Sequence, residues 1–168
     1  GASALPAWLV FDSATRTFSG TPENDDVTTL NIAVTATDST GASVSDTFAM
    51  EVANTNDAPM SMADGGIVGE DNILRYSGNV LINDSDVDAG TILSVTAPGE
   101  YVGKYGTLSI AADGGYTYSL DNGSDDVQSL AEGSAVVDQF TYNVTDGIVA
   151  VSGNLDITVT GANDAPVV

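Results

Sequence analysis

Three aspartates alternate within one short stretch of the sequence, NDSDVDAG, at Asp84, Asp86 and Asp88. Carboxylates at alternate positions of a loop can wrap a hard cation, and Ca²⁺ takes about six to eight oxygen ligands. Without a cation three such charges repel, so we interpret the loop as a calcium site, with a solvated acidic turn as the alternative. The loop is not an EF-hand, because Ala89 and Val95 stand where an EF-hand has its required Gly and Glu.

A second polar sequence, Asn-Asp-Ala-Pro, occurs twice, at residues 56–59 and 163–166. A simple turn before proline would explain one copy of Asn56 and Asp57, but the recurrence at Asn163 and Asp164 favours a calcium-binding linker. Asp146, in the sequence TDG, is either a further ligand or the Asp of an ordinary Asp-Gly hairpin turn.

Composition excludes several functional classes. The chain of 168 residues has 24 acidic residues against three basic ones, a net charge of −21. Binding to phosphate or anionic lipid needs basic patches, so we expect neither nucleic acid nor a membrane surface as a partner. Cysteine and histidine are absent, which removes ordinary zinc sites, disulfides and Ser-His-Asp catalysis. No apolar run reaches the roughly 18 residues of a membrane span, so membrane insertion is not expected. We also expect no enzymatic activity, because no catalytic constellation is present.

Alternation of apolar and polar residues predicts β-strands along the whole chain. Residues 30–37, 45–52, 140–144 and 155–159 show this period of two, and turn sequences separate the runs. Only residues 127–132 could form a short helix. Many short strands at this spacing predict an all-β fold of tandem immunoglobulin-like (cadherin-like) Greek-key β-sandwiches, each of about 100 residues.

The repeated Asn-Asp-Ala-Pro marks the ends of these modules, because each copy follows a strand and its proline ends the strand ladder. We therefore expect two domains, residues 1–57 and residues 58–168. The first is about half the length of a sandwich and offers only four strands, so it would leave apolar faces and a sheet edge open. We expect it to be an incomplete module whose missing strands precede Gly1 in a longer parent protein.

Two family resemblances cover nearly the whole chain. Residues 5–59, through LPAWLVFD and FSGTP, resemble the C-terminal half of a dystroglycan-type cadherin-like module. Residues 66–166, through GNVLINDSDVDAG, GTLSIAADGGYTYSL and FTYNVTDG, resemble a bacterial cadherin-like repeat of the VCBS type. Such modules occur in tandem in large secreted RTX-type adhesins and in some polysaccharide-degrading enzymes. The resemblance implies calcium at module junctions, an extracellular or bacterial cell-surface location, and a mechanical or adhesive role.

The resemblance also implies which residues hold calcium, at two module junctions. At the first junction the ligands would come from the preceding module, the linker and the following module: Glu23, Asp25, Asp26, Asn54, Asn56, Asp57, Asp84, Asp86, Asp88 and Asp146. At the far end of the second module a matching set would face a third module: Glu70, Glu132 or Asp138, Asn163 and Asp164. The chain has NDAP where animal cadherins have NDNxP, so the number of ions per junction stays open.

These observations lead to one functional hypothesis and one rival. The hypothesis is a calcium-rigidified extender or adhesion segment of a large bacterial adhesin, whose partners are neighbouring modules of the same chain, with cell-surface glycans or other cells as further candidates. The rival is a carbohydrate-binding module of a polysaccharide-degrading or biofilm system, which would need exposed aromatic side chains. Tyr101 and Tyr105 are the best candidates for exposed aromatics, whereas Trp8, Tyr116 and Tyr118 are expected to pack in the core.

Overall fold

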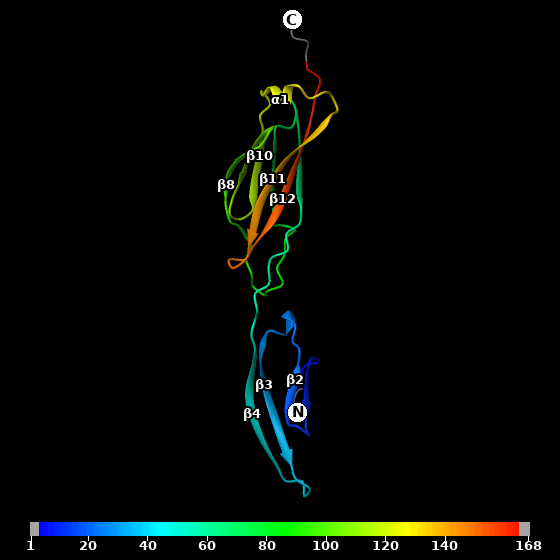
Figure 1. Ribbon diagram of the computed structural model, residues 1–168, viewed down its shortest axis with the longest axis vertical. Helices are drawn as coiled ribbons and strands as arrows, with labels where there is room; N and C mark the ends of the chain where they lie inside the picture. The colour runs from blue at the N-terminus through cyan, green and yellow to red at the C-terminus, as the bar shows by residue number, and fades with distance from the viewer. Residues whose placement is uncertain (1–3, 165–168) are drawn as a thin grey trace. The chain divides into compact units, whose positions relative to one another are not determined.

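The structure, a computed structural model, describes residues 4–164. The chain divides into two compact units, Gly1–Thr55 and Asn56–Val168, which we call unit 1 and unit 2. Within the described residues every regular element is a β-strand except one 3₁₀ turn and one short α-helix (Figure 1). The all-β fold expected from the sequence is therefore confirmed.

Unit 1 consists of two antiparallel hairpins in separate two-stranded sheets. The first hairpin joins β1 (Leu9–Asp12) to β2 (Thr17–Gly20), and the second joins β3 (Thr28–Thr37) to β4 (Ser43–Val52). A 3₁₀ turn, η1 (Asn24–Asp26), lies between them. These are the four strands that the sequence predicted for this region.

The long hairpin of unit 1 is amphipathic, because side chains on a strand alternate between faces. On one face the hydroxyls of Thr35 and Ser45 lie 2.7 Å apart. On the other face Ile32 pairs with Phe48, whose ring lies 5.7 Å from that of Phe18 on β2. Of the described apolar side chains of unit 1, only Leu9 and Ile32 are buried, so this unit has a small core.

Unit 2 is a sandwich of two four-stranded sheets. One sheet has the order β6-β10-β9-β8 and the other β5-β12-β11-β7, with β5 parallel to β12 and all other pairs antiparallel. Its elements are β5 (Asp64–Gly69), β6 (Arg75–Asn79), β7 (Ser94–Val95), β8 (Gly99–Val102), β9 (Gly106–Ile110), β10 (Gly115–Leu120), α1 (Asp125–Gln128), β11 (Ala135–Thr145) and β12 (Ala150–Thr160).

The core of unit 2 lies between the inner faces of its two sheets. Val68, Leu108, Tyr118, Leu155 and Ile157 are each at most 1% exposed. Buried and exposed residues alternate along β11 and β12, as the period of two predicts. The sequence-based expectation of half-buried strands is thus confirmed for both long hairpin strands of this unit.

The aromatic side chains of unit 2 are more buried than the sequence suggested. Tyr116 and Tyr118 pack in the core as expected. Tyr105 is only 8% exposed and Tyr101 packs against the core from β8, so the prediction that these two are exposed is wrong. The reason is that β8, the edge strand of its sheet, pairs Tyr101 with the buried Leu108 of β9, and the Tyr101 hydroxyl donates to the carbonyl of Ala97.

The short helix is shorter than its predicted range and begins earlier. The sequence suggested residues 127–132, whereas α1 spans Asp125–Gln128. Ser124 caps its N-terminus by accepting a hydrogen bond from the backbone N–H of Val127 at 3.4 Å. Between residues 4 and 164, no helix has the length and apolar character needed to cross a membrane.

Candidate metal site

The linker at the start of unit 2 is held against the acidic loop by backbone pairing. The N–H of Met60 donates to the carbonyl of Ser85 at 2.8 Å, and the N–H of Ser85 donates back at 3.1 Å. This isolated bridge brings residues 56–62 beside residues 84–88, although more than twenty residues separate them in sequence. The linker and the loop are therefore parts of one site.

Each loop aspartate uses one carboxylate oxygen to accept a backbone hydrogen bond. Asp84 Oδ1 accepts from Met62 N–H, Asp86 Oδ1 from Asp88 N–H, and Asp88 Oδ2 from Asp57 N–H, all at 2.8 Å. The second oxygen of each carboxylate, Asp84 Oδ2, Asp86 Oδ2 and Asp88 Oδ1, is buried and has no hydrogen-bond partner. In each of the three loop carboxylates, therefore, one oxygen accepts a hydrogen bond and the other has no donor.

A buried acceptor without a donor costs about 1–3 kcal/mol, and more when it is charged. A hard cation would satisfy such oxygens, and carboxylates suit Ca²⁺ or Mg²⁺ rather than softer metals. However, among the described residues no three acidic side chains converge closely enough to hold a metal by themselves. An ion here would need amide or carbonyl oxygens as additional ligands, which Ca²⁺ commonly uses.

Asp146 belongs to the same end of unit 2 and reaches the linker. Its Oδ2 accepts a hydrogen bond from Asn56 Nδ2 at 2.8 Å. Its Oδ1 accepts from the N–H groups of Val149 and Ile148, both at 2.7 Å. The N–H donors of Val149 and Ile148, together with the Asn56 amide, hold the pKa of Asp146 below its usual value. Asp146 is therefore a turn residue that also binds the linker.

Asp64 is a carboxylate of this region that sequence reasoning missed. Its Oδ2 accepts a 2.6 Å hydrogen bond from the Tyr142 hydroxyl. Burial raises the pKa of Asp64; the Tyr142 bond opposes this effect, and the charge of Asp84 adds to it. No local pattern marks Asp64, because its neighbours in the fold lie some 20 and 78 residues away in sequence.

The far end of unit 2 holds a second group of predicted ligands. Glu70 is only 2% exposed. Its Oε1 accepts from Gln128 Nε2 at 2.8 Å and its Oε2 from the N–H of Ala162 at 2.9 Å. Asn163 donates from Nδ2 to the carbonyl of Asp164 at 3.2 Å. The same bond, from Asn56 to the carbonyl of Asp57, is 2.7 Å long in the first copy of the repeat.

Two further polar residues near Glu70 were not anticipated. The backbone N–H of Asp71 donates to Asn122 Oδ1 at 2.9 Å, and Asn122 Nδ2 donates back to Asp71 Oδ1 at 2.7 Å. Asp71 has a φ of 58°, in the left-handed region, which Asp tolerates better than most residues. These two hydrogen bonds stabilise the turn directly after Glu70. The sequence does not predict them, because Asp71 and Asn122 lie 51 residues apart.

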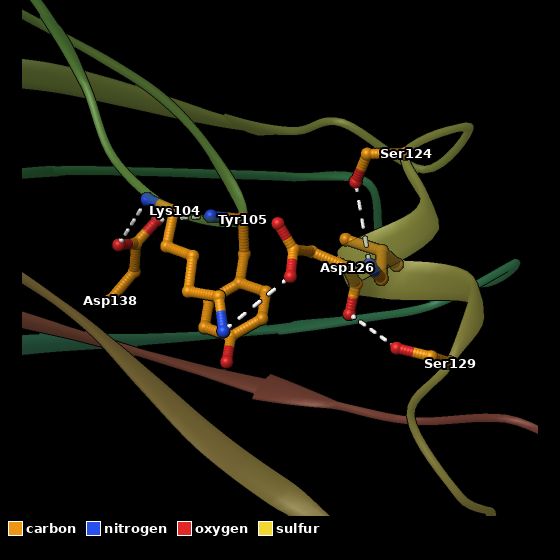
Figure 2. Close-up of polar contacts among 7 residues, drawn as sticks. Lys104, Tyr105, Ser124, Asp126, Ser129 and Asp138 are labelled. Carbon is orange, nitrogen blue, oxygen red and sulfur yellow. Dashed lines mark hydrogen bonds and ion pairs between the residues drawn. The ribbon is translucent and has the colours of Figure 1, made fainter.

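Asp138 has a structural role in the sandwich (Figure 2). Its Oδ1 accepts from Lys104 N–H at 2.9 Å, and its Oδ2 accepts from Tyr105 N–H at 3.0 Å and from the Tyr118 hydroxyl at 2.9 Å. Asp138 is 4% exposed, and both of its oxygens accept hydrogen bonds from protein donors. Its alternative, Glu132, is exposed to solvent.

Figure 2 also shows how the turn after β8 meets α1. The ammonium group of Lys104 lies 3.5 Å from Asp126 Oδ1 and 4.9 Å from the ring centroid of Tyr105. The Lys104 and Asp126 side chains are 61% and 56% exposed, and such ion pairs contribute little to stability because water screens them. The buried bonds of Asp138 are therefore the stronger attachment in this region.

The remaining predicted ligands lie in unit 1. Asp26 Oδ2 accepts a 2.9 Å hydrogen bond from the N–H of Glu23 across η1. Asp25, on the same turn, is exposed, and so is Asn54 after β4. Glu23, Asp25 and Asp26 thus share one short turn, and Asp26 stabilises it.

Comparison with known proteins gives two family matches. Residues 56–161 match the family of bacterial cadherin-like domains, and residues 1–53 match the family described as "Putative Ig domain". No curated protein matches the chain. The family of bacterial cadherin-like domains is non-enzymatic, its members generally bind Ca²⁺, and they are typically extracellular.

Several solved structures share the fold. The protocadherin Gamma B2 extracellular cadherin domains 1–5 match with a TM-score of 0.58 at 16% identity, over 96% of this chain and 32% of that chain. The protocadherin GammaB4 extracellular domain matches with a TM-score of 0.54 at 19% identity, over 93% and 26%. The endo-fucoidan hydrolase MfFcnA4 from glycoside hydrolase family 107 is 23% identical over 95% of this chain and 23% of that chain, but its TM-score of 0.39 supports no argument.

The chain spans only 23% to 32% of the length of these solved structures. At such low identity the protocadherin likeness shows a cadherin-like immunoglobulin fold and nothing about ligands. The family match is more informative, because it covers more than half of the chain and includes both the acidic loop and Asp146. This protein belongs to the bacterial cadherin-like domain family, whose match extends over residues 56–161.

Proposed function

We propose that this chain is a calcium-stiffened extender or adhesion segment of a large secreted or cell-surface bacterial adhesin. In this proposal unit 1 is of the dystroglycan type, unit 2 is of the VCBS type, and the partners are neighbouring modules of the same polypeptide. The family membership and the acidic charge support the proposal. The observation that carries it is the set of three buried, unpartnered carboxylate oxygens of Asp84, Asp86 and Asp88.

Calcium, when bound, would supply the positive charge and the oxygen coordination that these carboxylates lack. The residues that would hold it are the three loop aspartates together with oxygens of Asn56 and Asp57. The chain's own contacts already tie these parts together, because Asp57 N–H donates to Asp88 and the Asn56 amide donates to Asp146. The order of the linker therefore depends on the charge state of the loop.

Like charge explains why the cation would control stiffness. The loop aspartates and Asp146 place several negative charges beside the linker, in a chain of net charge −21. Repulsion between carboxylates weakens the backbone bonds that hold residues 56–62 in place. Neutralising that charge would favour the ordered linker, and a stiff linker is what an extender needs to transmit force between modules.

The test is isothermal titration of the metal-free chain with CaCl₂. Asp86→Ala removes a central carboxylate and is expected to weaken binding by at least about tenfold, because Ca²⁺ affinity follows the number of charged ligands. Asp156→Ala is the control: it also removes an aspartate, an exposed one on β12 opposite Gln139, and should leave the affinity unchanged. Equal affinities for the parent and both variants would refute the site.

Carbohydrate binding is the less favoured function. A flat glycan-binding face needs exposed aromatic rings, yet Tyr105, Tyr116, Tyr118 and Tyr142 are buried, and Tyr76 and Tyr101 are partly buried against the core. We therefore expect the chain to stay in the supernatant when it is mixed with insoluble polysaccharides. Retention that soluble glycan competes away would favour the carbohydrate-binding alternative.

A further inference from the structure

Two segments of unit 2 hold the linker through which the chain leaves β12. The N–H of Gly161 donates to the carbonyl of Ser134 at 3.0 Å, and the N–H of Gly133 donates back to the carbonyl of Gly161 at 3.2 Å. The N–H of Ala162 donates to Glu70 Oε2 at 2.9 Å. The Glu70 contact comes from the turn after β5, at the same end of unit 2 as α1 (Figure 1). Each of these bonds joins two groups of the chain itself.

Glu70 extends the pairing of β5 with β12 past its last residue pair, Gly69 and Thr160. The N–H of Glu70 donates to the carbonyl of Thr160 at 2.9 Å. Its carboxylate accepts from the N–H of Ala162, two residues further along the same segment. A hydrogen bond to a carboxylate is stronger than one between two neutral groups. The main chain and the side chain of one residue therefore bind the end of β12 and the start of the outgoing linker.

The second carboxylate oxygen of Glu70 also has a donor. Gln128 Nε2, on the last residue of α1, lies 2.8 Å from Glu70 Oε1 and 2.8 Å from the carbonyl oxygen of Asn122. These two acceptors use both hydrogens of the Gln128 amide nitrogen. The carboxylate of Glu70, a residue that is 2% exposed, thus accepts one hydrogen bond at each oxygen, and both donors are neutral groups.

The linker at the start of unit 2 is held by carboxylates in a different state. There the N–H of Asp57 donates to Asp88 and the N–H of Met62 donates to Asp84. Each of these two carboxylates keeps a second, buried oxygen that has no donor, and such an oxygen costs free energy. The two copies of Asn-Asp-Ala-Pro therefore adjoin carboxylates that differ in whether both of their oxygens accept hydrogen bonds.

The contacts at the far end do not favour the metal site that the family resemblance implies there. Both oxygens of Asp138 accept hydrogen bonds inside the sandwich, and Glu132 is exposed. Over the described part of unit 2, no three acidic side chains are grouped so that they could hold a metal ion. Glu70 is thus the buried carboxylate next to the outgoing linker, and its oxygens already have protein donors.

We propose that Glu70 anchors the outgoing linker without a metal: one carboxylate oxygen holds the N–H of Ala162, and the Gln128 amide satisfies the other. The comparison with the first linker rests on the proposed function, whereas the anchor rests only on the contacts of Glu70. Removal of calcium would then loosen residues 56–62 and leave residues 161–162 in place.

The experiment follows hydrogen exchange of single amides by NMR in the whole chain, with EDTA and with CaCl₂. The Ala162 amide is expected to be protected in EDTA and to exchange at the same rate in calcium, because its acceptor needs no cation. The amides of Asp57 and Met62 report on the first linker in the same spectra, and calcium should slow their exchange. The Ile157 amide, in the middle of β12, reports on the stability of unit 2 as a whole.

Three variants separate the anchor from a metal ligand. Glu70→Ala removes the acceptor, so the Ala162 amide should exchange at least about tenfold faster in EDTA. Glu70→Gln removes the charge but keeps an acceptor oxygen, so it should retain most of the protection and leave the calcium affinity of the chain unchanged. Glu132→Ala is the control, since it removes an exposed glutamate near the same linker. It should change neither readout, and the Ile157 amide should stay protected in all three.

Three outcomes would overturn the proposal. The first is an Ala162 amide that is unprotected in EDTA and becomes protected in calcium. The second is unchanged Ala162 exchange in Glu70→Ala while Ile157 stays protected. The third is a Glu70→Gln chain that loses both the protection of Ala162 and calcium affinity, measured by isothermal titration; this variant decides the question even if Glu70→Ala unfolds. Failure of the proposed calcium site would differ, because Asp57 and Met62 would ignore calcium while Ala162 stayed protected.

Discussion

At the scale of single residues, Asp138 accepts more hydrogen bonds than the other two buried carboxylates of residues 4–164, Glu70 and Asp88. It joins β11 to the turn before β9 and to Tyr118 through three bonds. Asp138→Ala would leave two backbone N–H groups and one hydroxyl without their acceptor in a buried place. We expect the free energy of unfolding of unit 2 to fall by about 2–4 kcal/mol, measured by urea denaturation followed by tyrosine fluorescence.

Asp156 provides the control for this substitution, because it lies on the outer face of the same hairpin, opposite Gln139, and is exposed. Asp156→Ala should change the free energy of unfolding by no more than about 0.5 kcal/mol. If both substitutions destabilise unit 2 equally, the three bonds of Asp138 do not carry the stability assigned to them.

The sequence shows which acidic residues share a loop, but it does not show which groups form hydrogen bonds with them. The alternation of Asp84, Asp86 and Asp88 is local, so it shows at once that three carboxylates share a loop. Which of their oxygens accept hydrogen bonds depends on the backbone N–H groups of Asp57 and Met62. These residues belong to a segment that is distant in sequence and pairs with the loop in the fold. Asp138 was assigned as a possible ligand from its resemblance alone, and its backbone donors lie 33 and 34 residues away.

At the scale of strands, several tyrosines of unit 2 pack directly over glycines. A Cβ atom built on Gly66 of β5 would lie 2.5 Å from Tyr76, and one on Gly153 of β12 would lie 2.5 Å from Tyr142. Gly66→Ala therefore forces the Tyr76 ring or the strand to move. We expect it to lower the free energy of unfolding of unit 2 by about 1–3 kcal/mol, measured by thermal and urea denaturation.

Gly123→Ala is the matched substitution, since its added methyl group would meet no atom within 4 Å. It should leave the stability of unit 2 within about 0.5 kcal/mol of the parent. Should Gly66→Ala prove equally neutral, the contact between Tyr76 and Gly66 cannot be what excludes a side chain there.

The local sequence pattern predicts where a strand lies, but it does not predict which strands pair with one another. The period of two identifies β3, β4, β11 and β12, because one face of each is apolar and these strands are long. β7 has only two residues, too few for any periodicity. The pairing of β5 with β12 joins residues 64–69 to residues 155–160, and nothing in either segment alone specifies the other.

At the scale of the whole molecule, the two units share one linker whose first residues are bonded to the acidic loop. A ligand that binds the folded state at a hundredfold excess over its Kd stabilises that state by about 2.7 kcal/mol. Calcium should therefore raise the melting temperature of the unit 2 transition.

If the cation also orders residues 56–62, calcium should narrow the distribution of molecular sizes measured by small-angle X-ray scattering, and EDTA should broaden it because the unscreened carboxylates repel. Magnesium at equal concentration separates a specific site from simple charge screening, since Mg²⁺ keeps its waters and demands a stricter geometry. Asp86→Ala should lose most of the calcium response, and Asp156→Ala should keep it. Identical scattering and melting curves in calcium and in EDTA would show that the acidic loop does not control the linker. The chain would then join its two units without a metal switch.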